Sequence, residues 1–177
     1  TDDFETSPTT TIAYDINGNV ARQTDAAGHI TRFEYDALNR AILVAVQDTT
    51  GWLTSSTTFD LAGNAKRTID VREHATDYNC DDRNRVVKVQ QPATNSLGRP
   101  TTTTTYDQFG NVKAVVDPRG GVTEYEYDKL NRLVHRLQPV PATGVTRPES
   151  VFAYDAAGNL YKTQLLVSRS SSNVEVW

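Results

Sequence analysis

The sequence predicts an all-β repeat protein in which antiparallel hairpins follow one another as a meander and form a curved, spiralling sheet. The first observation is an aromatic residue followed by Asp, which recurs at one phase along nearly the whole chain. The second is strand-like alternation before that aromatic residue, and the third is a Gly or Asn at the fourth position after it. We therefore expect about twelve to fourteen short strands with the aromatic residues stacked along one face.

The repeating unit is a pair of half-repeats. Spacings alternate between a fixed 21 residues, as from Tyr14 to Tyr35, and a longer interval of 24 to 27 residues. Pairs therefore begin near residues 14, 59, 106 and 154, within a repeat segment over residues 11–167. A polar extension over 1–10 precedes this segment and a polar tail over 168–177 follows it. The predicted ladder positions are Tyr14, Tyr35, Phe59, Cys80, Tyr106, Tyr127 and Tyr154.

The residues that lead into each ladder position read as a strand. Thr31, Phe33 and Tyr35 point one way, while Arg32 and Glu34 point the other. Alternation with a period of two, rich in Thr and aromatic residues, is typical of a half-buried strand. Residues 123–127 and 152–154 repeat the alternation, so the same strand is expected in each copy.

The residues after each ladder position are predicted to reverse the chain. One class of turn reads like "YDINGN" and the other like "YDALNR", so the fourth position holds Gly or Asn. Both residues tolerate positive φ, which predicts a type I turn closed by a residue in the left-handed region. The predicted turn-closing residues are Gly18, Asn39, Gly63, Asn84, Gly110, Asn131 and Gly158.

The Asp after each ladder residue is predicted to cap the turn. Its carboxylate can accept backbone N–H groups two or three residues on, which the reversal otherwise leaves unpaired. We favour this role over a catalytic one for Asp15, Asp36, Asp60, Asp81, Asp107, Asp128 and Asp155. Arg40 follows the second class of turn, as do Arg85 and Arg132, and we expect it to bond to the preceding turn.

A second, weaker turn follows each hairpin of the first class. Asp25, Asp70 and Asp117 align in "TDAAGHIT", "IDVREHAT" and "VDPRGGVT", which completes an antiparallel meander. Longer polar links follow each pair, so variation in length falls at one rim of the sheet. In the middle pair Glu73 replaces the expected Gly and Cys80 replaces the ladder Tyr, so this pair is predicted to be the loosest.

These motifs resemble the YD-repeat, or Rhs-repeat, family, whose half-repeat is approximately Tyr-x-Tyr-Asp-x-x-Gly-Asn/Arg-Leu. The strings "FEYDALNR", "YEYDKLNR" and "FAYDAAGNL" carry the resemblance, which covers roughly residues 10 to 165. It implies a β-sheet that spirals into a shell, similar to those that enclose a cytotoxic C-terminal segment in bacterial toxin-complex and Rhs proteins. Animal teneurins use a related barrel to display adhesion surfaces.

The resemblance implies a non-enzymatic structural role as scaffold or encapsulating wall. The parent is then a larger secreted or cell-surface bacterial protein, a polymorphic or complex toxin. The implied partners are the remaining repeats of the parent chain, or another copy, joined through open sheet edges. An enclosed toxin domain is the further partner that the resemblance implies.

Composition excludes several other classes. The net charge is −4 and no basic block is present, so nucleic acid is not an expected partner. No apolar run approaches the roughly 20 residues of a membrane helix. The single Cys80 excludes an internal disulfide, and no cofactor is expected. The chain lacks Met and begins on Thr1, which predicts an excised or processed fragment.

One catalytic alternative has weaker support. "DPRGG", beginning at Asp117, is similar to the sequence near the cut of the family's self-cleaving aspartate protease, but Asp117 aligns with the turn residues Asp25 and Asp70. The histidines are not at metal-ligand spacing, so no metal site is expected. They are interpreted as solvent-facing residues of strands or turns: His29, His74 and His135.

Carbohydrate binding or adhesion at the cell surface is the main functional alternative. Trp52 and Tyr161 are expected to be exposed, near turns rich in Asp and Asn. Aromatic faces pack against the apolar faces of sugar rings, so these two residues are the candidate ligand-binding positions.

Overall fold

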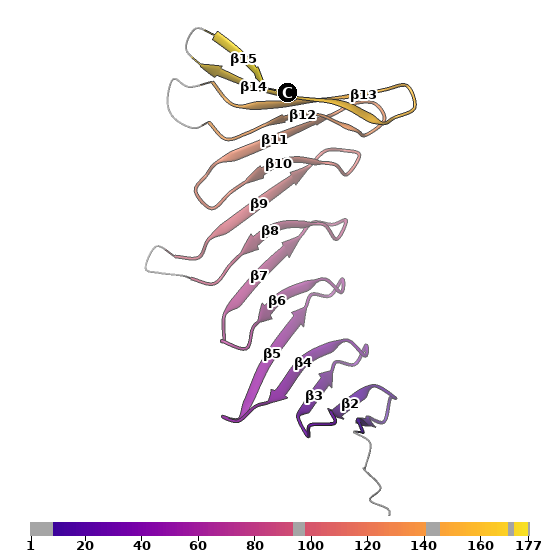
Figure 1. Cartoon of the computed structure of the whole chain (residues 1–177). Coiled ribbons are helices and arrows are strands. Elements are labelled where there is room, and N and C mark those ends of the chain that lie inside the picture. Colours follow the sequence, from indigo (N-terminus) through magenta and orange to yellow (C-terminus); the bar gives the residue numbers. More distant parts are fainter. Residues whose placement is uncertain (1–8, 94–97, 141–145, 170–171, 177) are drawn as a thin grey trace, which may run out of the picture. The chain divides into compact units, whose positions relative to one another are not determined.

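The computed structural model describes residues 9–93, 98–140, 146–169 and 172–176, and Figure 1 labels all of their strands except the first. All regular secondary structure in these residues is β-strand, and most connections are tight turns. None of the described residues forms a helix of the length and apolar character that a membrane span requires. The chain divides into two compact units, residues 1–78 and 79–177.

The first unit is an antiparallel meander. Each strand pairs with the next along the chain, and β7 ends two residues beyond the unit boundary. The strands are β1 (Thr11–Tyr14), β2 (Val20–Thr24), β3 (Ile30–Tyr35), β4 (Ala41–Gln47), β5 (Trp52–Phe59), β6 (Ala65–Ile69) and β7 (Ala75–Cys80).

The second unit repeats the same topology. Consecutive strands again pair antiparallel from β8 to β15. The strands are β8 (Val86–Gln90), β9 (Thr101–Tyr106), β10 (Val112–Val116), β11 (Val122–Tyr127), β12 (Leu133–Leu137), β13 (Glu149–Tyr154), β14 (Leu160–Arg169) and β15 (Ser172–Val176). The prediction of an all-β antiparallel meander is confirmed in each unit.

The described residues contain fifteen strands, one more than the upper end of the predicted range. The additional strand is β15, whose backbone pairs with β14 from Leu165 to Arg169. It lies within residues 168–177, for which the sequence predicts a polar tail. Polar composition alone therefore did not reveal this strand, because backbone pairing requires no apolar side chain.

A register shift marks the ladder residue of the hairpins. Between β3 and β4, Glu34 lies opposite Leu43, but the next residue, Tyr35, lies opposite Ala41. One residue of β4 between these two partners therefore has no partner in β3. Equivalent shifts occur just before Tyr14, Phe59, Tyr127 and Tyr154. A type I turn followed by a left-handed residue forms such a bulge, and it increases the local twist of the strands.

The residues whose burial is described, 9–93, 98–140 and 146–166, do not form a core of the size that the chain length suggests. Only Ala45 and Ser150 among them are buried, at 7% and 4% exposure. The ladder residues from Tyr35 onward are half-buried, and Tyr14 is 61% exposed. The reason is that a side chain on a single sheet has neighbours only in its own layer, whereas a core requires two packed layers.

The two faces of the first unit differ in charge. The ladder face is the one that carries the ladder residues and every second residue before them. The strand pairing places charged side chains on the opposite face: Arg22, Arg32, Glu34, Arg67 and Asp77. Arg67 and Asp77 form an ion pair there, with Nε and Oδ1 2.5 Å apart.

Candidate functional site

The hairpin rim is the set of seven turns that follow the ladder residues, and it holds a repeating pattern of contacts. In the first turn the Asp15 N–H donates to the Asn19 carbonyl at 2.8 Å, and the Gly18 N–H donates to the Asp15 carbonyl at 3.1 Å. The same two bonds recur in every turn of the rim. The closing residue has a φ of 59° to 61° where it is Asn and 86° to 97° where it is Gly. Both classes of turn therefore share one backbone conformation.

The rim Asp residues accept hydrogen bonds from their own turns. Oδ1 of Asp36 accepts the N–H groups of Leu38 at 2.9 Å and Arg40 at 3.0 Å. These donors lie two and four residues after the Asp, whereas the sequence predicted donors two or three residues after it. The difference arises because the left-handed residue places the fourth N–H against the carboxylate. Equivalent bonds reach Asp15, Asp81, Asp107 and Asp128. We propose on this geometry that the rim Asp residues act as turn caps.

The contacts also set the charge of these carboxylates. Hydrogen bonds from the side chain and backbone of Arg85 lower the pKa of Asp81 to about 2. The Arg40 side chain, followed by its backbone N–H, lowers the pKa of Asp36. The side chain of Asn111 is the largest cause of the lowered pKa of Asp107. These groups are thus ionised at neutral pH, which suits a hydrogen-bond acceptor and does not suit a general acid.

The arginine after each turn of the second class bonds to the preceding Asp, as predicted. Arg40 Nε donates to Asp36 Oδ2 at 2.7 Å, and its second nitrogen lies 2.6 Å from the same oxygen. The guanidinium carbon also lies 4.2 Å from the ring centre of Phe59, the ladder residue that opens the next pair. Arg85 lies 4.1 Å from the Tyr106 ring. Each arginine thus joins its own turn to the following hairpin.

Arg132 repeats this arrangement at the last described junction, with its guanidinium carbon 4.6 Å from the Tyr154 ring centre. Sequence reasoning missed the stacking. The available signal was that the arginines occur only in turns that precede the ladder aromatic of a new pair. A guanidinium over an aromatic ring contributes roughly 0.5 to 2 kcal/mol, according to how far it is desolvated.

Turns of the first class use asparagine where the second class uses arginine. Asn19 Nδ2 donates to Asp15 Oδ2 at 3.0 Å and to Asn39 Oδ1 at 2.8 Å. Asn111 makes the same two contacts in the second unit, with Asp107 and Asn131. The side chain therefore links the two turns of one pair.

Three ladder tyrosines bond back to the preceding hairpin. The Tyr35 hydroxyl donates to the Val20 carbonyl at 3.0 Å. Tyr106 and Tyr154 make equivalent bonds, to the carbonyls of Val86 and Leu133, both at 2.9 Å. Phe59 and Cys80 have no phenol with which to make this bond. Rings, hydroxyls, amides and guanidinium groups thus form ties between successive hairpins along the rim.

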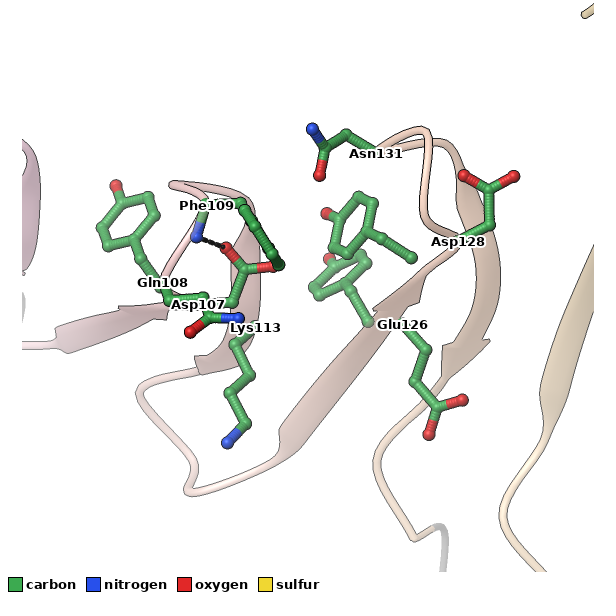
Figure 2. Close-up of a pocket in the computed structure, with 10 residues that line it drawn as sticks. Asp107, Gln108, Phe109, Lys113, Glu126, Asp128 and Asn131 are labelled. Atoms are coloured by element: carbon green, nitrogen blue, oxygen red, sulfur yellow. Dashed lines mark hydrogen bonds between the residues drawn. The ribbon is translucent and has the colours of Figure 1, made fainter.

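A groove of about 580 Å³ lies between two neighbouring turns of the second unit, as Figure 2 shows. One turn follows Tyr106 and the other follows Tyr127. A smaller hollow of about 370 Å³ lies at the preceding junction, and there Arg85 forms part of the lining. The lining of the groove includes Tyr106, Asp107, Phe109, Tyr125, Tyr127 and Asn131.

The two candidate carbohydrate-binding residues lie in different units. Trp52 is on β5 and 40% exposed, and Tyr161 is on β14 and 68% exposed. The guanidinium carbon of Arg32 lies 4.4 Å from a Trp52 ring centre, so one face of the indole is already in contact with a cation. A sugar could therefore stack only on the face of the indole that Arg32 leaves uncovered.

Asp117, the residue of the self-cleavage alternative, accepts the backbone N–H groups of Arg119 at 2.7 Å and Gly121 at 2.8 Å. Asp25 and Asp70 accept the same two bonds in their own turns. Glu73 closes the Asp70 turn with a φ of 64°, the conformation that Gly adopts in the equivalent turns.

The histidines contact carboxylates. His29 and His74 are exposed and lie 2.9 and 3.3 Å from Asp25 and Asp70. His135 differs from the expectation because it is half-buried and contacts Glu149 on the neighbouring strand. Within the described parts of the chain, no group of three or more His, Cys, Asp and Glu side chains is placed to hold a metal ion.

Comparisons with known proteins identify repeats of the same kind. The family model described as "RHS Repeat" matches residues 14–51 and 106–139. No curated protein sequence matches the chain significantly. Among solved structures, the Tc holotoxin pore of Photorhabdus luminescens matches with a TM-score of 0.73 at 20% identity, over 94% of this chain and 9% of that one.

Two further structures give a similar result. A crystal structure of TcdB2-TccC3-Cdc42 has a TM-score of 0.74 and one of TcdB2-TccC3 has 0.73, both at 20% identity over 94% of this chain. The chain spans 9% and 10% of the length of those two proteins. At this identity the likeness establishes a shared fold.

Proposed function

Because the chain is a YD/Rhs-repeat protein, we propose that it forms part of the wall of an encapsulating shell. The shell belongs to a larger secreted or cell-surface bacterial protein of the toxin type. This proposal is supported by the solved structures that share the fold, which are Tc toxin assemblies of which the chain matches about a tenth. The role of the chain itself is structural and non-enzymatic.

The observation that carries this proposal is the tie between successive hairpins. The contact of Arg40 with both Asp36 and the Phe59 ring joins one pair to the next, and the contact of Asn19 with Asn39 joins two turns within a pair. A wall one sheet thick has no second layer to hold its strands in register. Contacts along the rim supply that function between the hairpins that they join.

The rim carboxylates are occupied by this structural task. Asp36 bonds to backbone N–H groups through one oxygen and to Arg40 through the other. Its lowered pKa keeps it ionised, so it does not hold a proton for transfer near neutral pH. These contacts favour a structural role for the rim over catalysis.

The open edges are the proposed contacts with the rest of the wall. Within the described residues β1 is bonded to β2 alone, so its other edge is available to a further strand. An exposed edge favours pairing with the next repeat of the parent chain or with another copy. In the parent, the segment that follows the repeats is the proposed enclosed toxin domain.

The ladder face is proposed to face the interior of the shell. In the first unit the charged strand residues gather on the opposite face, where water solvates them. The ladder face instead presents tyrosines and threonines such as Thr31 and Tyr35. In the second unit Arg136, the strand partner of Tyr125, lies on the same face, so the proposed lining is mainly but not wholly uncharged.

Protease protection of the intact parent protein tests encapsulation. The segment that follows the repeats should resist protease in the parent, and should be cleaved rapidly when it is produced alone. Equal cleavage rates in both contexts would contradict the proposal.

The alternative function, carbohydrate binding, is tested by a glycan array with Trp52→Ala as the control. Binding that this substitution abolishes would favour carbohydrate recognition.

A further inference from the structure

An aspartate, a guanidinium and an aromatic ring form a recurring cluster at the junctions between pairs. In the second unit, Arg85 lies 2.6 Å from Asp81 Oδ2, and its guanidinium carbon lies 4.1 Å from the centre of the Tyr106 ring. Arg132 stands between Asp128 and Tyr154 in the same way. The fold thus repeatedly places a cation between the Asp of one turn and the ladder ring of the next.

At the junction within the third pair, the aspartate and the ring are present but the arginine is not. Asp107 and Tyr127 occupy the positions of Asp81 and Tyr106, while Asn111 replaces the arginine. The Asn111 amide donates to Asp107 Oδ2 and to Asn131 Oδ1, both at 3.0 Å. The groove at this junction is about 580 Å³, against about 370 Å³ where Arg85 is present.

Aromatic side chains form much of the lining of the groove. Figure 2 shows Phe109 and Asp107 on one side and Asn131 and Asp128 on the other. Tyr106, Tyr125 and Tyr127 complete the aromatic lining. Phe109 is 71% exposed, so its ring is available to a ligand. Aromatic faces attract cations, and guanidinium more than ammonium because it is planar and weakly hydrated.

One carboxylate of the groove has no arginine of its own among the described residues. Asp128 is paired with Arg132. Arg83 and Arg85 line the neighbouring hollow together with Asp107, but they bond to Gln108 and Asp81. The described contacts of the Asp107 carboxylate are with neutral groups of Phe109 and Asn111, whereas Asp36, Asp81 and Asp128 each bind an arginine. Burial, and then the neighbouring Tyr125 and the charge of Asp107, raises the pKa of the Tyr127 phenol. The Asp107 carboxylate is thus close enough to the ring to interact with its charge, although burial is the larger cause of the shift.

We propose that this groove binds the guanidinium group of an arginine side chain from a polypeptide partner. The guanidinium lies over the Tyr127 ring and directs N–H groups to Asp107, as Arg85 does between Tyr106 and Asp81. Phe109 covers the outer side of the ligand. The inference rests on the repeated geometry of this chain and does not depend on the shell function.

A titration of the whole chain with N-acetyl-arginine amide, followed by NMR, tests the proposal. We expect saturable shifts at residues 106–113 and 125–131, with a Kd on the order of 1 to 10 mM for a single stacked and charge-assisted side chain. N-acetyl-lysine amide should bind several-fold more weakly, and N-acetyl-norleucine amide should produce no saturable shift. Tighter binding of norleucine amide or of methyl glucoside than of arginine amide would overturn the proposal.

Two variants separate this site from a structural effect. Asn111→Arg should place an internal guanidinium over Tyr127, so affinity for the arginine probe should fall by about tenfold or more. Phe109→Ala removes an exposed side chain and should weaken binding without unfolding the hairpin. Undiminished binding to both variants, or no saturable shift at probe concentrations well above the expected Kd, would contradict the assignment.

Discussion

Replacing Glu73 with glycine should stabilise the first unit. Glu73 has a φ of 64° and closes a turn in which the first and third pairs have Gly28 and Gly120. The left-handed region costs a residue with a Cβ roughly 1 to 2 kcal/mol. Glycine also increases the entropy of the unfolded chain, which offsets roughly 0.4 to 1 kcal/mol of the gain. We therefore expect Glu73→Gly to raise the free energy of unfolding by about 1 kcal/mol.

Gly28→Ala is the matched control, because it makes the reverse change in the equivalent turn of the same unit. Gly28 has a φ of 88°, and a Cβ at this position would meet nothing within 4 Å. With no steric clash, the change in stability reflects the strain of positive φ, less the entropy that alanine removes from the unfolded chain. Urea unfolding followed by circular dichroism measures both variants, and hydrogen exchange at residues 70–74 locates the effect. An unchanged midpoint for Glu73→Gly, together with no loss for Gly28→Ala, would refute the reasoning.

Three other predictions concern the rim and the edges. Arg40→Ala should lower the free energy of unfolding by at least roughly 1 kcal/mol through the lost ring contact, while exposed Arg22→Ala should change it little; equal urea midpoints for the two variants would count against the tie between pairs. The pKa of Asp81 is lowered from 3.8 to about 2, so its contribution to stability is complete above pH 3.8 and disappears as the pH falls towards 2; Asp81→Asn should flatten this part of an acid-unfolding curve. Open edges predict self-association at high concentration, and light scattering that detects only monomer would contradict this.

The sequence predicts the strands and turns well because their causes are local. The third residue after the Asp of each "YD" pair adopts a left-handed conformation, which favours Gly or Asn, as at Gly18 and Asn39. The same pattern recurs in each copy, which strengthens the prediction. The alignment also placed Glu73 at a glycine position, where its φ is indeed positive. These features depend on neighbouring residues and therefore appear directly in the sequence.

The contacts between hairpins were less accessible to sequence reasoning. The stacking of Arg40 on Phe59 joins residues 19 positions apart (59 − 40), and only the sheet register brings them together. The contact between His135 and Glu149 depends similarly on the pairing of β12 with β13. The low burial is a property of the single-layer arrangement, since alternation along a strand does not indicate whether either face is covered.

The most direct test of the proposed wall is the accessibility of its two faces in the parent protein. Leu53 and Thr54 are adjacent and exposed on β5, and they point to opposite faces because their partners are Val46 and Ala45. Leu53→Cys and Thr54→Cys, each in a background with Cys80→Ser, can be labelled with a bulky maleimide. We predict that in the parent Thr54→Cys reacts and Leu53→Cys, on the ladder face, is protected, whereas both react in the isolated chain. Equal labelling of the two positions in the parent would contradict the account.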